Sequence, residues 1–306
     1  MAAIRIGISG WRYGPWRGEF YPKGLVQRNE LKFASRAVNS IEINGSFYAL
    51  QTPERYRGWA ADTPDDFVFS IKAPRLITHI KRLRDIEKPM ANFFASGLGQ
   101  LEGRLGPILW QFPPSFKFDA ALIEAFFQQL PTTHRAAKTL ASHSDERRHL
   151  EGYLDWPGKQ PLRHAMEIRH ESFVDEAFVE LLRQYKVALV VADAAKKWPY
   201  AEDLTSDFVY MRLHGDKKLY SSGYSAPALK RWHERIDAWS HGKQPVDAHL
   251  IAPESKPSHA SRDVYCYFDN DVKVRAPFDA RALLQSFDLT QALATCPGVL
   301  PQGINL

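Results

Sequence analysis

The sequence predicts a TIM-type (β/α)8 barrel, and three observations support that prediction. Eight short apolar runs occur along the 306 residues, and all except the first end in charged, amide or histidine residues. Helix-like stretches separate most of these runs, and strands that alternate with helices form a parallel sheet. The chain is long enough, because a barrel of this type needs about 250 residues before insertions. The runs are IRIGIS (4–9), VNSIEIN (38–44), FVFSIK (67–72), PILWQ (107–111), HAMEIR (164–169), VALVVAD (187–193), DFVYMRLH (207–214) and VYCYFDN (264–270).

Polar residues enter these runs with a period of two near their carboxyl ends. In the second run, Ile41 and Ile43 share one face, and Glu42 and Asn44 share the other, because successive strand side chains alternate. A strand that is buried on both faces is normally apolar throughout, and a buried charge without a partner is costly. A ring of polar side chains at one mouth of the barrel explains the pattern.

Helical periodicity appears between several of the strand runs. Apolar residues three or four apart follow Asp119, a candidate N-cap, over residues 122–130. The same spacing occurs over residues 178–185 and 229–239. These segments are suited to the crossover helices that connect parallel strands.

We expect one barrel domain over residues 1–288 and a surface tail over residues 289–306, which contains two prolines and two glycines. Two stretches exceed what a minimal barrel needs. Residues 131–160 are polar and mixed in charge, and they predict an extra helical segment beside the fourth crossover. Residues 243–262 predict a long irregular loop before the last strand.

An open doubly wound sheet is the main alternative architecture. Its dinucleotide-binding form favours a GxGxxG turn after the first strand. Here the stretch GISGWRYGPWRG (residues 7–18) has glycines at other spacings and continues with aromatic residues. The sequence contains no Walker motif either, so a nucleotide-binding open sheet is disfavoured.

Composition places only broad bounds on function. The formal net charge of +5 and the sequence pI of about 9.1 permit an anionic partner without requiring one. Two cysteines, Cys266 and Cys296, are too few for a disulfide framework or a cysteine-based metal site. The first residues enter a strand directly and lack a signal-peptide pattern. No stretch approaches the roughly 18 apolar residues of a membrane span, so we expect a cytoplasmic protein with no membrane partner.

Segments spread over nearly the whole chain share the character of one known family. They are GISGWRYGPWRGEFYP, SIEINGSFYALQTPERYRGWA, FVFSIKAPRLITH, LGPILWQFPPSFKFD, HAMEIRHESF, VADAAKKWP, DFVYMRLHGDKKLYSSGYS and VYCYFDND, in this order. Together, from Ile4 to Phe287, they resemble the YecE-like family, also called domain of unknown function 72. The resemblance implies a TIM-barrel fold, in agreement with the strand pattern. It supplies no catalytic motif, so the roles below are assigned from chemistry, and residues 243–262 are longer than the family's usual connection.

The candidate site lies at the carboxyl ends of the strands and in the loops after them, where barrels of this type place their catalytic groups. We predict that acid–base chemistry and charge stabilisation use Glu42, Lys72, Glu167, Asp193 and His214. Substrate binding is predicted to use Trp11, Asn44, Tyr48, Gln111, Arg169, His170, Arg212, Tyr224 and Asn270. The cations Lys72, Arg169 and Arg212 favour an anionic small-molecule ligand, since guanidinium groups suit oxyanions.

An ion-pair network that only closes the barrel is the structural alternative, with Glu42–Lys72 and Glu167–Arg212 as candidate pairs. We favour function, because the polar layer is richer than closure requires and buried pairs are weak stabilisers. The basic stretch 78–89 is either a solvated helical face or an extension of the positive field around the mouth.

We expect no metal and no cofactor. His79, His170 and His214 lack the close spacing of metal ligands, and cations at the mouth oppose a divalent ion. Lys72 would become a Schiff-base nucleophile in a dry pocket. Carboxylates on nearby strands favour its charged form instead.

Three function classes remain open. The first is an enzyme, a hydrolase, isomerase or lyase, that acts on a phosphate- or carboxylate-bearing small molecule by general acid–base chemistry. The second is a nucleic-acid-binding or repair-related barrel whose basic, aromatic rim stacks bases. The third is a non-catalytic ligand- or partner-binding barrel. The sequence does not indicate the oligomeric state.

Overall fold

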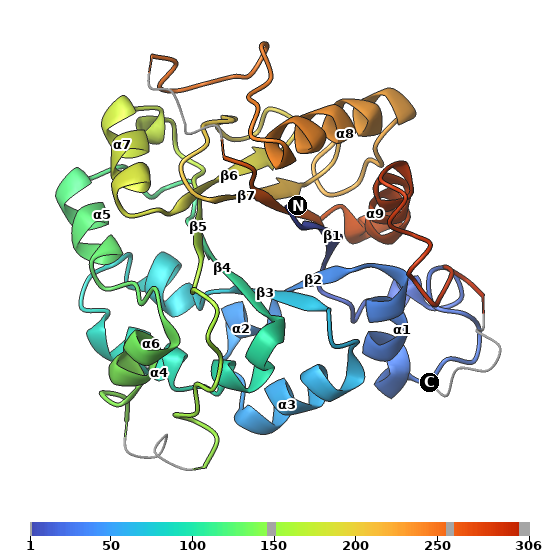
Figure 1. Cartoon of the computed structure of the whole chain (residues 1–306), viewed down its shortest axis with the longest axis horizontal. Helices are drawn as coiled ribbons and strands as arrows, with labels where there is room; N and C mark the ends of the chain where they lie inside the picture. The colour runs from blue at the N-terminus through green and yellow to red at the C-terminus, as the bar shows by residue number, and fades with distance from the viewer. Residues whose placement is uncertain (1, 146–150, 255–259, 300–306) are drawn as a thin grey trace. The chain divides into compact units, whose positions relative to one another are not determined.

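The computed structural model describes residues 2–145, 151–254 and 260–299. These residues form eight parallel strands that close into a barrel in chain order (Figure 1). Each strand begins and ends within two residues of its predicted run, and the predicted barrel is confirmed. The strands are β1 (Ile4–Ser9), β2 (Ser40–Ile43), β3 (Val68–Lys72), β4 (Leu105–Gln111), β5 (His164–Glu167), β6 (Ala188–Asp193), β7 (Phe208–Leu213) and β8 (Asp263–Phe268).

The chain divides into two compact units. Unit 1 consists of Met1–Glu42 together with Ala188–Leu306, and unit 2 is the continuous stretch Ile43–Val187. Unit 1 therefore contains both ends of the chain, whereas unit 2 is one uninterrupted segment.

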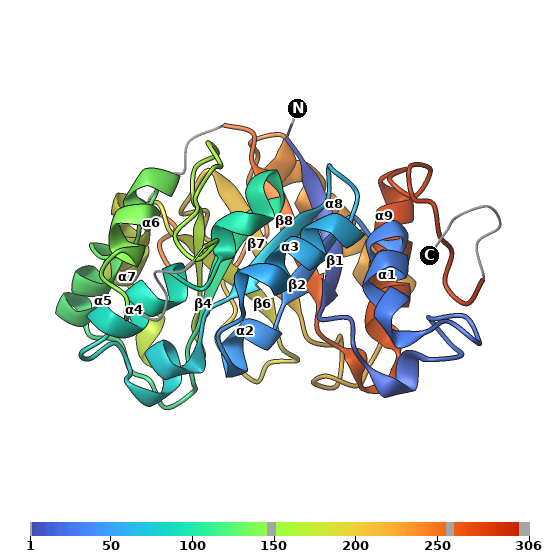
Figure 2. The ribbon, with the colours of Figure 1, turned by 90° about the horizontal axis from the view of Figure 1, so that it is seen from below.

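In unit 1, β6 pairs with β7, β7 with β8, β8 with β1 and β1 with β2. Three helices accompany these strands: α1 (Glu30–Ala37), α8 (Ala226–Ser240) and α9 (Arg275–Ser286). Helix α9 packs on β1 and β8, and it lies beside α1 in both ribbon views (Figures 1 and 2). The Arg281 guanidinium joins the two helices by donating through Nη1 to the Ala37 carbonyl at 2.9 Å.

The pairing of β1 with β2 depends on a glycine. Gly7 lies opposite Ser40, and a Cβ atom at Gly7 would stand only 1.7 Å from the Ser40 carbonyl oxygen. Because that obstacle is backbone, no side-chain rotation relieves it. Only glycine permits this spacing of the two strands.

An aromatic cluster and the described part of the predicted tail close one side of unit 1. Phe20 and Tyr21, from the loop after β1, contact Phe33 of α1 with ring centroids 5.5 and 5.8 Å away. The Thr295 hydroxyl donates to the Phe33 carbonyl at 3.0 Å, and the Gly298 N–H donates to the Phe20 carbonyl at 2.8 Å. The tail up to residue 299 is thus anchored on the cluster, and residues 300–306 lie outside the described part.

In unit 2, β3 pairs with β4 and β4 with β5. Helices α4 and α6 pack against each other, as do α5 and α7 (Figure 2). Trp110 of β4 lies in the core, edge-on to the rings of Phe93 and Phe126, and its indole N–H donates to His164 Nδ1 at 3.1 Å. The helices are α2 (Gly45–Tyr48), α3 (Pro53–Asp62), α4 (Glu87–Phe94), α5 (Ala120–Phe127), α6 (His134–Ala141) and α7 (Glu176–Gln184).

The helix predictions are confirmed where the sequence made them. Helix α8 covers its periodic segment, α7 ends one residue before the end of its segment, and α5 ends three residues early, at Phe127. Asp119 caps α5 by accepting from the Leu122 N–H at 3.2 Å. Helix α6 is the extra helix of the 131–160 stretch, of which residues 146–150 lie outside the described part. The described part of the long loop, residues 243–254 and 260–262, contains neither helix nor strand.

The basic stretch 78–89 is not a helical face. It begins in a π-helical turn, Leu76–Ile80, closed by a hydrogen bond from the Lys81 N–H to the Leu76 carbonyl at 2.8 Å. Arg82, Leu83 and Asp85 then take positive φ angles, and α4 starts only at Glu87. Among all described residues, no helix is both long enough and apolar enough to cross a bilayer.

Candidate functional site

The predicted site residues follow the carboxyl ends of strands in both units, as a parallel barrel requires. Those of unit 1 are Trp11, Glu42, Asp193, Arg212, His214, Tyr224 and Asn270. Those of unit 2 are Asn44, Tyr48, Lys72, Gln111, Glu167, Arg169 and His170.

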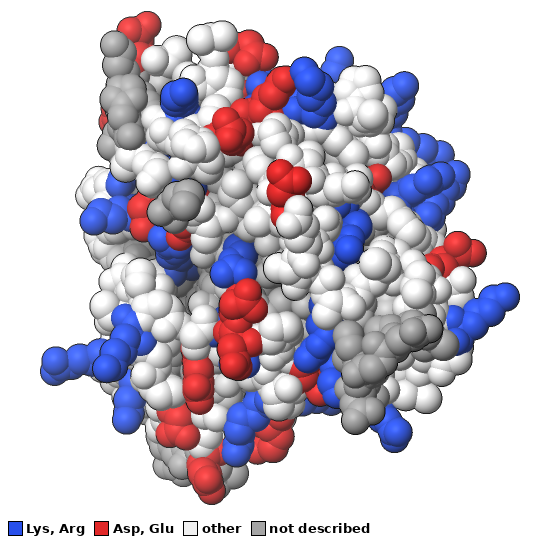
Figure 3. Space-filling model, turned by 45° about the vertical axis from the view of Figure 1, so that its right-hand side comes forward, with Lys and Arg blue, Asp and Glu red and all other residues white. Residues whose placement is uncertain are grey.

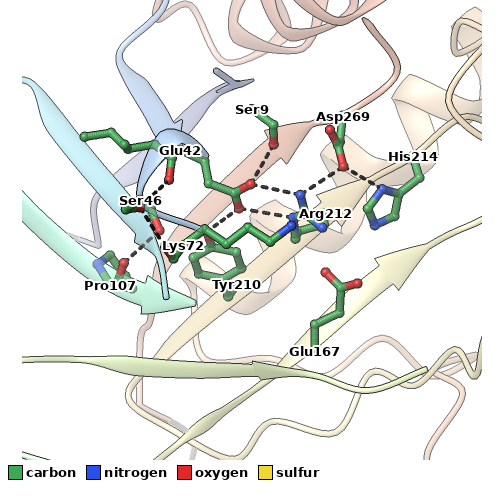
Figure 4. Close-up of polar contacts among 12 residues, drawn as sticks. Ser9, Glu42, Ser46, Lys72, Pro107, Glu167, Tyr210, Arg212, His214 and Asp269 are labelled. Atoms are coloured by element: carbon green, nitrogen blue, oxygen red, sulfur yellow. Dashed lines mark hydrogen bonds and ion pairs between the residues drawn. The ribbon is translucent and has the colours of Figure 1, made fainter. Parts of the chain in front are cut away.

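In unit 1, Glu42 is the centre of a buried hydrogen-bond network (Figure 4). Its Oε1 accepts from Ser9 Oγ at 2.8 Å and from Arg212 Nη2 at 2.9 Å. Its Oε2 accepts from the Tyr210 hydroxyl at 2.7 Å and from Arg212 Nε at 3.1 Å. Glu42 and Arg212 are fully buried or nearly so. This bidentate, charge-assisted pair holds both side chains in one geometry.

Asp269 extends the network to the predicted histidine. Its Oδ2 accepts from Arg212 Nη2 at 2.9 Å and lies 3.1 Å from His214 Nδ1. The His214 ring is buried, with the rings of Trp198 and Tyr220 edge-on to it at 5.4 Å each. The carboxylate beside one ring nitrogen and the aromatic rings around the imidazole fix the orientation of His214.

Asp193 lies in a second polar group of unit 1. Its Oδ2 accepts from the Tyr224 hydroxyl at 3.3 Å and lies 3.9 Å from Arg231 Nη2. Burial raises the pKa of the Asp193 carboxyl above its ordinary value, and Arg231 opposes that rise. The Tyr224 hydroxyl also accepts from the Gly215 N–H at 3.1 Å, so Tyr224 links the loop after β7 to the end of β6.

Two further residues of unit 1 have structural contacts. Asn270 is buried and donates through Nδ2 to the Ser222 carbonyl at 2.9 Å and to Asp279 Oδ2 at 2.8 Å. Trp11 is nearly buried, and its carbonyl accepts from the Tyr21 hydroxyl at 2.5 Å. The side chain of Asn270 therefore ties the last strand to the loop that carries Tyr224, and Trp11 ties its loop to the aromatic cluster.

In unit 2, Lys72 lies at the end of β3 against an aromatic ring. Its Nζ is 4.3 Å from the centroid of Phe47, which is a cation–π contact. The Ser46 hydroxyl donates to the Lys72 carbonyl at 2.7 Å, so α2 is fastened to the strand that presents the amine (Figure 4). Asn44 stands just before α2, and its buried Oδ1 has no hydrogen-bond donor among the described residues.

Glu167 and Arg169 form the second charge pair of the site. Arg169 Nε donates to Glu167 Oε1 at 2.6 Å. Glu167 is buried, whereas 11% of the Arg169 side chain is exposed. Solvent and ligands can therefore reach the guanidinium of Arg169 more readily than that of Arg212, of which 1% is exposed.

His79 joins this group, although the sequence did not single it out as a site residue. Its Nδ1 is 2.8 Å from Thr78 Oγ1 and its Nε2 is 3.4 Å from Gln111 Nε2. Burial, followed by the charges of Lys72 and Arg169, lowers the pKa of His79 to about 4. The imidazole is thus neutral at pH 7, so one ring nitrogen can donate a hydrogen bond and the other can accept one.

The remaining two predicted residues of unit 2 differ in their surroundings. His170 caps the short helix Glu171–Phe173, because its Nδ1 accepts from the Ser172 N–H at 3.0 Å. This contact orients the loop after β5. Tyr48 is 69% exposed and packs edge-on against Phe47 at 5.1 Å between ring centroids.

Sequence reasoning assigned no role to several residues that the structure brings into contact with the predicted ones. Ser9 ends the first run, and Tyr210 shares strand parity with Arg212, so both were open to inference from alternation. Asp269 was visible as a strand-end carboxylate. Phe47 and His79 lie in helical turns after β2 and β3, where a period of two gives no signal.

Both arginines of the site form ion pairs with carboxylates. Each arginine pairs with carboxylates of its own unit: Arg212 binds Glu42 and Asp269, and Arg169 binds Glu167. The pairs Glu42–Lys72 and Glu167–Arg212 stay predictions. Among the described residues, no group of three or more histidine, cysteine or carboxylate side chains is arranged to hold a metal ion.

Comparison with known proteins identifies the family. The family model described as "Protein of unknown function DUF72" matches residues 5–302. The UPF0759 protein YecE of Escherichia coli O157:H7 is 26% identical over 240 residues, which cover 77% of this chain and 82% of that protein. The UPF0759 protein YunF of Bacillus subtilis (strain 168) is 30% identical over 118 residues, which cover 37% of this chain and 41% of that protein.

Solved structures agree on the fold. A DUF72 family protein from Thermotoga maritima matches with a TM-score of 0.68 at 24% identity, over 94% of this chain and 99% of that one. A second, from Enterococcus faecalis, gives a TM-score of 0.62 at 15% identity, over 94% and 99%. The match over nearly the full length of the chain, and the barrel it shares with these structures, show that this chain belongs to the DUF72 family.

Proposed function

We propose that this protein is an enzyme that binds a phosphate- or carboxylate-bearing small molecule at the carboxyl ends of its strands and acts on it by general acid–base chemistry. The observation that supports this most directly is the group formed in unit 2 by Lys72, His79, Glu167 and Arg169. It combines two cations, a buried carboxylate and a neutral histidine in one place.

Electrostatics favours an anion at this group. The positive charges of Lys72 and Arg169 oppose protonation of His79 and contribute, after burial, to its low pKa. The same field stabilises a negatively charged ligand that comes close to the imidazole. Arg169 is the better candidate anchor of the two guanidinium groups, since it is the more exposed and since two carboxylates already bind Arg212.

The roles follow from this environment. Arg169 binds the oxyanion of the substrate, and Lys72 stabilises negative charge that develops during the reaction. Glu167 accepts a proton from the substrate as the base and then returns that proton to the product, while the neutral imidazole of His79 donates a hydrogen bond to the developing charge. In unit 1, the saturated contacts of Glu42 suit a residue that positions Arg212 and Asp269 better than one that accepts a proton from substrate.

Phosphate binding, measured by titration calorimetry, tests the anion site. Arg169→Ala is expected to weaken binding by about tenfold or more, because a hydrogen bond to a charged group contributes about 1.5–3 kcal/mol. Arg104→Ala is the matched control, since Arg104 pairs with Asp65 just before β4 begins. Equal phosphate affinities of wild type, Arg169→Ala and Lys72→Ala would refute the anion site.

Turnover tests the catalytic role. A panel of phosphorylated and carboxylated metabolites is offered to wild type and to Glu167→Gln, with product formation followed over time. Glu167→Gln should keep its ligand affinity and lose about 100-fold or more in rate, the scale of acid–base catalysis. A ligand that binds and is never converted would instead identify a non-catalytic binding protein.

Binding of nucleic acid, measured at a series of salt concentrations, distinguishes the nucleic-acid alternative from our proposal. On the face shown in Figure 3, lysine and arginine side chains alternate with acidic ones and form no continuous basic area. Our proposal expects no binding of single- or double-stranded DNA or RNA that strengthens steeply as salt is lowered, because the proposed ligand is a small molecule. Such binding, with the slope typical of phosphate contacts, would favour the nucleic-acid alternative.

A further inference from the structure

A second feature of unit 2 is an apolar groove beside Phe47. Its volume is about 390 Å³, within the range of small-molecule sites. Side chains from α2, from the π-helical turn after β3 and from the start of α4 line it. Those used below are Phe47, Tyr48, Arg75, Leu76, Ile80 and Lys88.

The groove gathers side chains that water would normally disfavour at a surface. Tyr48 is 69%, Ile80 61% and Leu76 42% exposed, and all three line this one cavity. Exposed apolar side chains that cluster in this way mark a binding surface more often than single exposed apolar side chains do. The π-helical turn that supplies Leu76 and Ile80 belongs to a rare conformation that is frequent at functional sites.

The charged side chains that line the groove, among the described residues, are both cationic: Arg75 and Lys88. One described carboxylate is close by, since the lining residue Asn92 donates through Nδ2 to Asp145 Oδ2 at 2.8 Å. The Arg75 guanidinium carbon lies 5.9 Å from the centroid of the Tyr48 ring, so the cation borders the aromatic wall. Apolar walls with a cationic edge complement a molecule that is apolar in its body and negatively charged.

Phe47 connects the groove to the proposed anion site. One face of its ring receives Lys72 Nζ at 4.3 Å, and the His79 ring meets it edge-on at 5.0 Å. Phe47 also lines the groove. A ligand in the groove would therefore touch Phe47, the same residue that contacts Lys72 and His79.

We propose that this groove binds the apolar, ring-bearing part of the substrate, so that the substrate is an aryl phosphate or aryl carboxylate instead of a wholly polar anion. This inference rests on the proposed function, which assigns the anionic group of the substrate, and it adds the chemical class of the rest of the substrate. Tyr48 supplies a ring for stacking, Leu76 and Ile80 supply aliphatic contact, and Arg75 adds a positive edge.

The test compares 1-naphthyl phosphate with inorganic phosphate by titration calorimetry. Wild type is expected to bind the aryl phosphate at least about tenfold more tightly, a difference of about 1.4 kcal/mol. Ile80→Glu, at an exposed position, should abolish this advantage, which is taken as the ratio of the two affinities so that any effect of the added charge on phosphate binding in general cancels. Val174→Glu is the matched control, because Val174 is 50% exposed and does not line the groove.

The outcomes separate the two proposals. If the aryl phosphate binds no more tightly than phosphate, or if Ile80→Glu keeps the advantage, the groove proposal is overturned. If Ile80→Glu abolishes the advantage while Arg169→Ala binds both ligands like wild type, the groove stands and the anion site fails. If sedimentation shows a wild-type dimer that Ile80→Glu dissociates, the groove is a self-association surface and the ligand proposal is overturned.

Discussion

Replacing Glu42 by glutamine is expected to destabilise the barrel by removing the charge at the centre of the unit 1 network. The amide keeps the size of the carboxylate, but its NH2 group cannot accept a hydrogen bond. Glu42 accepts from Ser9, from Tyr210 and twice from Arg212. One side of the amide would therefore face donors that it cannot satisfy.

The size of the effect follows from the burial of the pair. Removing one partner of a buried ion pair costs about 3–5 kcal/mol. Asp269 still neutralises Arg212 through its contact at 2.9 Å, so we expect the low end, about 3 kcal/mol. A loss of this size lowers the melting temperature by at most about 6–12 °C, because 1 kcal/mol shifts a protein of 150–250 residues by about 2–4 °C.

Urea unfolding at pH 7 measures the change, with Ser9→Ala as the matched control, since it removes a single donor. That control should cost about 1 kcal/mol. Adding Arg212→Met to Glu42→Gln removes the stranded charge and should restore part of the stability, with a coupling energy of about 1 kcal/mol or more. A Glu42→Gln variant within about 0.5 kcal/mol of wild type, or one with no coupling to Arg212, would refute this account.

Two other predictions concern stability. His164 is buried, and burial lowers its pKa from 6.5 to about 4. Below pH 6.5 the unfolded chain therefore binds a proton at His164 that the folded protein does not bind. The stability that neutral His164 contributes is present above pH 6.5 and is lost as the pH falls towards 4, by up to about 1.4 kcal/mol per pH unit. Between pH 7 and pH 5, the free energy of unfolding measured in urea should fall less for His164→Gln than for wild type. An equal fall in both proteins would contradict the lowered pKa of His164. Gly7→Ala should destabilise the protein by about 3 kcal/mol or more, because the new Cβ forces β1 away from β2. Gly58→Ala in α3 is the control and should be neutral or stabilising, because its Cβ would meet open space. A lower melting temperature for Gly58→Ala than for Gly7→Ala would be inconsistent with the strand spacing.

The strands were predictable because each carries its signal locally. An apolar run such as residues 187–193 is short, uniform and ended by a carboxylate, and the observed β6 coincides with it within one residue. Helices with a clear apolar stripe, such as α8, were equally accessible. Helix α3 was not, because Gly58 and several charged residues interrupt its ten residues.

The candidate site was predictable as a location and not as a set of contacts. Alternation within β7 placed Tyr210, Arg212 and His214 on one face, and the structure brings all three into one polar network. Their partner Asp269 comes from the end of β8, and the pairing depends on how the two strands align, which no single segment encodes. His79 was missed because a π-helical turn, set by one backbone hydrogen bond, brings it beside Gln111.

The division of the chain has a consequence for synthesis. Unit 2 is continuous, so all of its contacts become available once residue 187 has left the ribosome. The strands β1 and β2 emerge first, yet β8, the other neighbour of β1, ends at Phe268. At about 5–20 residues per second, the amino-terminal strands wait roughly ten seconds or more with an unpaired edge. We therefore expect unit 2 to be able to fold before the amino-terminal strands are fully paired, which leaves the free edge of β1 accessible to chaperones.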